Sequence, residues 1–296
     1  MDNYNKVQLK DHLDFPDEVK HIINTKQYDK VRDYINFDLC IMMRDSLLST
    51  LLNDNNYGVI KYVINNMHSI NCVDDYGWSL IHYLSAAYKN DIKLVNYFFE
   101  KYHLDLQLSD YYDEKPIHTA CESGTFEMVK FLVKNGADLE SETNDNRRPI
   151  HFVFQRDDDG DDDLLLFEIF KFLADKGADL ESKDDRHCTP LHLACQYESV
   201  ATIEFLVKSG VNLEVTSHSG WRPIHVVCYY SSKIETIKYI LDQNVILDTR
   251  INSFNGNDSD FDIIDLLMKN DNLTPENKSE ILHIILRKIC TAMYNF

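Results

Sequence analysis

The chain has 296 residues, enough for two ordinary domains or one long repeat array, and 44% of them are hydrophobic, so it can bury a core. Its 49 acidic and 30 basic residues give a net charge of −19, which disfavours binding to nucleic acid or to an anionic membrane surface. The charge either favours a protein partner with a basic surface or serves only solubility.

The start of the chain is polar, and no segment has the length of uncharged apolar sequence that a transmembrane helix needs. The seven cysteines are odd in number and include no CxxC pair, which suits a reducing compartment better than a disulfide framework. We therefore expect an intracellular protein, cytoplasmic or nuclear, that is monomeric and has no membrane anchor.

The first 38 residues predict two short helices. Pro16 would lie in the first turn of one helix, where Asp17 and Glu18 would complement the positive end of the helix dipole. The second helix would cover residues 28–35. We interpret residues 1–38 as an N-terminal helical cap for the repeats that follow, because the end units of stacked repeats usually depart from the repeat pattern.

Five short strings recur along the chain, and each ends in a histidine. The histidines are separated by 36, 33, 41 and 33 residues, which is a near-constant period. Four strings have a proline two positions before the histidine, where a helix can begin because the missing N–H would have no partner there. The strings occupy residues 78–82, 114–118, 147–151, 188–192 and 221–225.

Apolar residues at helical spacing follow the strings, as in 126–133 and 203–207. Three units then end in a glycine suited to a left-handed helix end, at Gly136, Gly177 and Gly210. The residue five before each histidine tolerates a positive φ, which predicts a tight hairpin-like turn. These turn residues are Gly77, Asp113, Asn146, His187 and Gly220.

This pattern resembles the ankyrin-repeat family, and residues 188–195 match the family's T-P-L-H-x-A string in full. The resemblance implies an all-α solenoid, in which stacked helix pairs are linked by β-hairpin-like loops and closed by helical caps. It also implies a non-enzymatic scaffold that binds a partner protein through the hairpin tips and the concave helix face.

We divide the chain into a cap, an array of about six repeats over residues 39–249, and a C-terminal cap or degenerate repeat over residues 250–296. The first repeat is degenerate, and the C-terminal segment predicts a helix pair at 260–269 and 275–290. The predicted repeats are 39–73, 74–109, 110–142, 143–183, 184–216 and 217–249.

Two features depart from the family pattern. Lys115, Arg148 and Arg222 replace the family's threonine, so these units should lose a local hydrogen bond and gain exposed cations near the hairpin. The fourth repeat has eight extra residues, which include the acidic run 157–163 and should fall in the turn between its helices. The run lacks the calcium-loop pattern, because Gly160 stands fourth rather than sixth, so we interpret it as a solvated loop that could meet a basic segment.

Three His–Cys pairs, each spaced by three residues, could in principle bind metal. They recur at the repeat period, so stacking should hold the pairs apart, and the resemblance implies structural histidines bonded to neighbouring backbone. No phosphate-binding loop, HExxH or GxSxG motif occurs, and we predict no enzymatic activity, cofactor or metal site. The pairs are His118 with Cys121, His192 with Cys195, and His225 with Cys228.

We expect partner binding near the hairpins, because tryptophan, tyrosine and arginine dominate interface hot spots. Trp78 and Trp221 stand four residues before a histidine, at a position that the family leaves variable, but their rings could instead pack between hairpins as scaffold. The candidate partner-binding residues are Tyr76, Trp78, Tyr111, Tyr112, Arg147, Arg148, Arg186, His218, Trp221 and Arg222.

An alternative function is that of a substrate adaptor for a ubiquitin ligase. Some ankyrin proteins carry an F-box-like helical segment at one end. Residues 15–19, and more weakly residues 274–278, resemble the start of such a segment. An ordinary helix N-terminus would explain both strings equally well.

Overall fold

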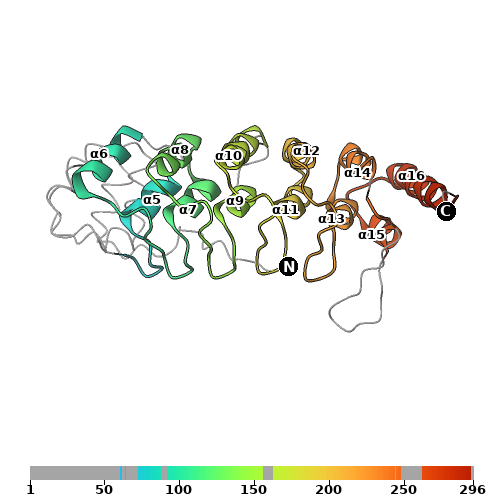
Figure 1. Cartoon of the computed structure of the whole chain (residues 1–296), viewed down its shortest axis with the longest axis horizontal. Helices are drawn as coiled ribbons and strands as arrows, with labels where there is room; N and C mark the ends of the chain where they lie inside the picture. Colours follow the sequence, from blue (N-terminus) through green and yellow to red (C-terminus); the bar gives the residue numbers. More distant parts are fainter. Residues whose placement is uncertain are drawn as a thin grey trace, which may run out of the picture. The chain divides into compact units, whose positions relative to one another are not determined.

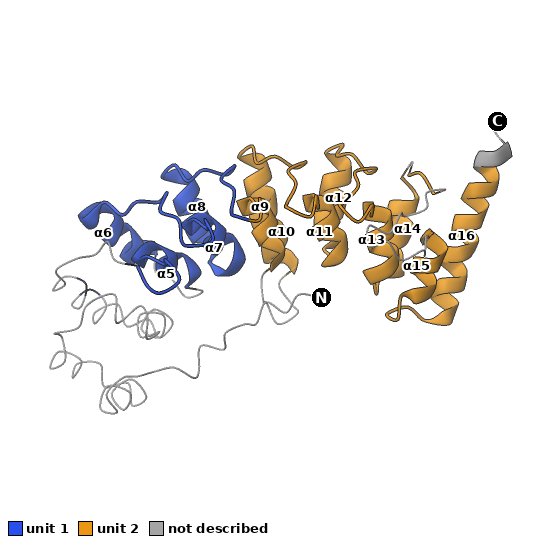
Figure 2. Cartoon of the chain, turned by 90° about the horizontal axis from the view of Figure 1, so that it is seen from below, with its two compact units in different colours: residues 1–144 blue, residues 145–296 orange. Residues whose placement is uncertain are grey.

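The computed structural model describes residues 61, 64, 73–87, 92–155, 163–243, 245–247 and 262–294. Within these ranges the chain is helical, and an isolated bridge between Val73 and Ser79 is its only strand-like feature. The chain divides into two compact units, residues 1–144 and 145–296, coloured blue and orange in Figure 2. The predicted all-α class is confirmed.

The described residues of unit 1 form two helix pairs. The first pair is α5 (Leu80–Ala86) and α6 (Ile92–Tyr102), and the second is α7 (Pro116–Ser123) and α8 (Phe126–Lys134). Helix α5 packs against α7, and α6 packs against α8, so equivalent helices of successive repeats are neighbours (Figure 1). The faces that meet are apolar and buried, as Phe98 of α6 illustrates. Stacking therefore buries the apolar face that a single pair would expose.

The described residues of unit 2 repeat the same arrangement in four pairs. Helices α9, α11, α13 and α15 follow one another in one layer, while α10 packs on α12 and α14 packs on α16 in the other (Figure 1). The elements are α9 (Pro149–Phe152) with the 3-10 turn η2 (Val153–Gln155), α10 (Asp163–Asp175), α11 (Pro190–Gln196), α12 (Val200–Lys208), α13 (Pro223–Tyr230), α14 (Ile234–Leu241), α15 (Ile263–Lys269) and α16 (Pro275–Tyr294).

The predicted helix signals are confirmed. Proline is the first residue of α7, α9, α11 and α13, and the residue before each proline is extended. The three glycines that follow the second helix of a pair are left-handed, with φ values of 91°, 95° and 79° for Gly136, Gly177 and Gly210.

The predicted turns are confirmed as well, because the residue five before each repeat histidine has a positive φ. Two of these residues are glycines, and the others are residue types that tolerate this conformation better than most. The φ values are 86° for Gly77, 61° for Asp113, 55° for Asn146, 57° for His187 and 74° for Gly220.

The insertion in the fourth repeat is not confined to the turn where it was expected. Helix α10 has 13 residues, whereas its equivalents α8 and α12 have nine, so about half of the eight extra residues lengthen this helix. The acidic run 157–163 lies outside the described residues except for Asp163, which begins α10. The Asp163 carboxylate accepts a hydrogen bond of 2.6 Å from the Ser199 hydroxyl.

The predicted C-terminal helix pair is present as α15 and α16. The buried Asn270, at the end of α15, donates hydrogen bonds from its side-chain amide to the carbonyl oxygens of Cys228 (3.0 Å) and Ser231 (2.8 Å). These bonds fasten the pair to the end of α13. The N-terminal cap 1–38 and nearly all of repeat 39–73 lie outside the described residues, and the six-repeat division stays a prediction.

Candidate functional site

Within each unit the hairpin tips form a row that is held together by backbone hydrogen bonds. In each bond the donor is the backbone N–H of the residue seven positions before one repeat histidine. The acceptor is the carbonyl oxygen of the residue six positions before the preceding repeat histidine. In unit 1, Tyr111 donates to Tyr76 at 3.1 Å and Asn144 donates to Tyr112 at 3.0 Å. The same bonds occur in unit 2 between Asp185 and Asp145 and between His218 and Arg186, both at 2.8 Å.

A buried aspartate eight residues before the histidine organises three of these tips. The Asp110 carboxylate accepts two backbone hydrogen bonds of 2.8 Å, from Tyr112 and Glu114, and a third of 3.1 Å from the Trp78 indole N–H. Asp74 and Asp184 accept equivalent backbone bonds in their own tips. These aspartates were not among the residues predicted from the sequence, although their constant distance from the histidine was a usable signal.

Three candidate tyrosines lie exposed on the tips of unit 1. Tyr76, Tyr111 and Tyr112 have exposed fractions of 52%, 66% and 56%. The backbone bonds between their hairpins fix the places from which the three rings project. The tips therefore present a preorganised aromatic surface to solvent.

The two tryptophans are not the exposed side chains that their position predicted. Trp78 is half-buried, because its indole N–H donates to Asp110 and its ring packs edge-on against Tyr83 at 5.2 Å between centroids. Trp221 is also half-buried, and its ring meets Tyr229 at 5.4 Å and Tyr230 at 6.2 Å. These contacts are those expected of scaffold tryptophans.

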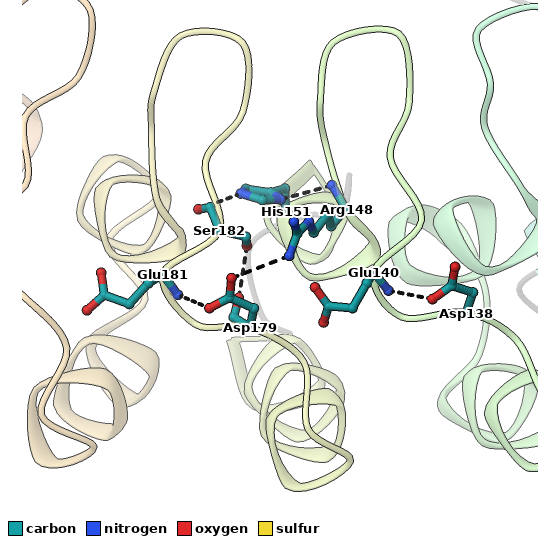
Figure 3. Close-up of polar contacts among 7 residues, drawn as sticks. All are labelled: Asp138, Glu140, Arg148, His151, Asp179, Glu181 and Ser182. Carbon is teal, nitrogen blue, oxygen red and sulfur yellow. Dashed lines mark hydrogen bonds and ion pairs between the residues drawn. The ribbon is translucent and has the colours of Figure 1, made fainter.

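Arg148 and Arg222 are also not the exposed cations that were expected. Their side chains are only 23% and 15% exposed, and each forms an ion pair, Arg148 with Asp179 at 3.3 Å and Arg222 with Glu214 at 2.8 Å. Figure 3 shows Arg148 reaching the Asp179 carboxylate. Arg148 therefore pairs with the loop that follows α10, and Arg222 pairs with the loop that follows α12, which leaves little of either for a partner.

The remaining candidates in unit 2 are divided between exposed and half-buried positions. Arg186 is exposed and pairs with Asp184 at 3.4 Å, whereas Arg147 is half-buried. His218 is exposed, and its ring lies 3.7 Å from the ring of His187 on the neighbouring tip.

Two further exposed tyrosines of unit 2, Tyr197 and Tyr230, were not predicted from the sequence. They lie at the ends of α11 and α13, the first helices of their pairs. Each stands five residues after its repeat histidine, His192 or His225. Their shared position was a signal, but nothing in the sequence shows that a helix ends there with its ring in solvent.

The repeat histidines have a structural role. In all five repeats the ring Nδ1 accepts a hydrogen bond from the backbone N–H just before the helix, for example from Lys115 to His118 at 2.9 Å and from Arg148 to His151 at 3.0 Å. The Nε2–H of four of these rings then donates to a carbonyl oxygen of the next hairpin or loop, as from His151 to Ser182 at 3.3 Å (Figure 3). Both bonds require a neutral ring with its proton on Nε2.

Burial lowers the pKa of the five repeat histidines below its ordinary value, to about 4 for His118 and His225. Burial also raises the pKa of the Cys228 thiol to about 12, and it raises that of Cys195 as well. These thiols are therefore packed as small apolar groups rather than prepared as nucleophiles. Among the described residues, no group of three or more His, Cys, Asp or Glu side chains is placed to hold a metal ion.

The model of the family described as ankyrin repeats (three copies) matches residues 47–143 and 165–255, which is well over half of the chain. The chain belongs to the ankyrin-repeat family. The general role of ankyrin repeats is to bind other proteins, and the gap between the two matched segments contains the acidic insertion. No curated protein matches this ankyrin-repeat chain. Of the helices in the described ranges, none combines the length and apolar character needed to cross a membrane.

Proposed function

We propose that this chain is a non-enzymatic scaffold that binds a partner protein through its hairpin tips and its concave helix face. The observation that carries the proposal is the set of three exposed tyrosines on the tips of unit 1, Tyr76, Tyr111 and Tyr112. Large aromatic side chains are costly to leave in water side by side, and they are enriched in the hot spots of interfaces.

The rigidity of the tips supports the same proposal. A partner that docks on a surface already fixed by backbone bonds pays little conformational entropy for ordering it. In the helices, by contrast, the repeat histidines and the cysteines of α11 and α13 are buried, and the histidines are bonded to backbone atoms. These contacts support a structural role for both residue types rather than a catalytic one.

The experiment is affinity capture from the native cell with the full chain and with a triple variant, Tyr76→Ser, Tyr111→Ser and Tyr112→Ser. The proposal predicts that the variant keeps its melting temperature and loses the captured protein. A matched control, Leu286→Ser, removes an exposed apolar side chain from α16, far along the sequence from the tips. Equal capture by the triple variant and the control would contradict binding through the tips.

The ligase-adaptor alternative is not favoured by any observation. Residues 15–19 lie outside the described residues, and residues 274–278 form an ordinary helix start, in which the Thr274 hydroxyl accepts from the backbone N–H of Asn277 at 3.2 Å. The expectations of an intracellular location and of a monomer, drawn from cysteine usage and composition, stay predictions.

A further inference from the structure

We propose that the unit 1 tip patch, defined as Asp75, Tyr76, Tyr111, Tyr112 and Asp113, binds a segment of the partner protein that is rich in arginine or lysine. The inference rests on the proposed function, because it assigns a chemistry to the partner that the tips would bind. It is carried by the combination of exposed aromatic rings with exposed carboxylates on one rigid surface.

The charge of the patch has one sign. Residues 73–79 and 108–114 form the two tips and contain five acidic residues and no lysine or arginine. Asp75 and Asp113 are exposed, and no described side chain pairs with either carboxylate. Lys115 follows the second tip, and its ammonium donates to the Gln107 side chain at 3.2 Å. A cationic partner would therefore meet carboxylates that the patch itself does not neutralise.

The aromatic rings supply the second half of the recognition. A guanidinium or ammonium group is attracted to the face of a tyrosine ring, at a centroid distance of up to about 6 Å. Tyr111 and Tyr112 lie on the second tip next to Asp113, and the N–H of Tyr111 bonds the carbonyl oxygen of Tyr76, which follows Asp75 on the first tip. An arginine side chain can stack on a ring while its charged edge faces a carboxylate.

The tips of unit 2 provide a contrast within the same fold. There the equivalent positions carry Arg186, His187 and His218 beside Asp145 and Asp185, so the surface adds a cation and two imidazoles to its carboxylates. The backbone arrangement is the same in both units, and only the side chains differ. The preference for a cationic partner is therefore assigned to the unit 1 tip patch and not to hairpin tips in general.

The test measures fluorescence anisotropy of a short labelled peptide that alternates arginine with glycine and serine, titrated with the full chain at low salt. The control peptide carries glutamate in place of arginine. We expect the arginine peptide to bind and the glutamate peptide not to bind. Because one Debye length is only about 10 Å at 0.1 M salt, added salt should weaken the carboxylate contribution.

Two sets of variants assign the binding to the patch. Asp75→Asn with Asp113→Asn should weaken binding about fivefold, and asparagine keeps the positive φ of residue 113 accessible. Asp271→Asn with Glu276→Gln removes the same charge from exposed positions near α16 and should change affinity less than about twofold. Tyr111→Leu should weaken binding about two- to fivefold, whereas Tyr111→Phe should retain it.

Equal binding of the two peptides, or equal loss in the two charge variants, would overturn the inference. So would unchanged binding by Tyr111→Leu, which removes the ring face and leaves the carboxylates in place. If a native partner is still captured through the tyrosines while the arginine peptide fails to bind, the proposed function stands and only the cationic chemistry of the partner is wrong.

Discussion

A Cβ atom on Gly77 would lie 2.8 Å from both the backbone nitrogen and the ring Cδ1 of Tyr111. Gly77 turns the first hairpin of unit 1, and Tyr111 belongs to the second, so the two tips touch at the point where no side chain fits. The glycine at position 77 therefore allows the close approach of the two tips that carry the exposed tyrosines.

Gly77→Ala should destabilise unit 1 by about 2–3 kcal/mol, because it adds a clash with Tyr111 to the strain of an alanine at positive φ. Gly136→Ala is the matched control, since its φ of 91° is equally left-handed and nothing lies within 4 Å of the added Cβ. The control should lose only about 1 kcal/mol. Urea unfolding of both variants measures the difference, and equal losses would show that the contact carries no energy.

Asp110→Ala should be among the more damaging single substitutions in unit 1. It removes the acceptor of two backbone N–H groups and of the Trp78 indole, at a site that is 5% exposed. Unsatisfied buried donors cost about 1–3 kcal/mol each, so we expect a loss of at least about 3 kcal/mol in the free energy of unfolding. Trp78→Phe removes only one of the three bonds and should cost less. Asp75→Ala, on the exposed side of the same row, should change stability by less than about 0.5 kcal/mol.

The stability of the chain should fall with acid between pH 6.5 and about 4. The repeat histidines are neutral when folded, with pKa values of about 4 for His118 and His225, whereas an unfolded histidine titrates near 6.5. The unfolded chain therefore binds more protons as the pH falls through this window, and the free energy of unfolding decreases. The stabilisation that these neutral histidines give to the folded chain is fully present above pH 6.5 and amounts to about 3 kcal/mol for His118.

Urea unfolding as a function of pH measures this dependence. His118→Gln should lower stability at pH 7 and flatten the slope between pH 4 and 6.5, while His283→Gln, on the exposed face of α16, should leave the slope unchanged. A slope that is the same in the native chain and in His118→Gln would show that other groups cause the acid sensitivity.

Asn270→Ala should loosen the C-terminal helix pair from the rest of unit 2. The side-chain amide holds two carbonyl oxygens at the end of α13 and is buried with them, so the loss leaves both acceptors unsatisfied. Relative to the native chain, backbone hydrogen exchange in the variant should accelerate more in α15 and α16 than in α11 and α12. The exposed neighbour Asn272, whose side-chain amide donates to the Tyr230 carbonyl at 2.8 Å, is the control, and Asn272→Ala should leave exchange nearly unchanged.

The regular parts of this fold could be predicted because they depend on residues with strong local preferences. Proline before a helix, glycine after one, and Asp113 or Asn146 at a positive φ are requirements of a single turn, and the sequence displays them directly. The histidine bonds recur at the repeat period, so the role implied for one histidine applied to the others.

The state of the candidate site could not be predicted to the same extent, because it depends on partners that lie outside the local hairpin motif. Nothing near Arg148 or Arg222 in the sequence shows that Asp179 or Glu214 lies within reach after stacking. Trp78 likewise becomes half-buried through Asp110, 32 residues away. The tyrosines of unit 1, by contrast, stay exposed after the tips have stacked, which only the stacked structure reveals.

The bonds that join successive tips run from backbone to backbone, so they place no demand on the side chains that the tips display. Tyrosine and aspartate in one unit and arginine and histidine in the other are held by the same bonds. Under the proposed function, recognition and architecture are thereby separable in this molecule, and substitution of the exposed tip side chains can change the target while the bonds between tips remain. The same independence makes the tips suitable for grafting, since the left-handed residue five positions before the repeat histidine is common to all five tips.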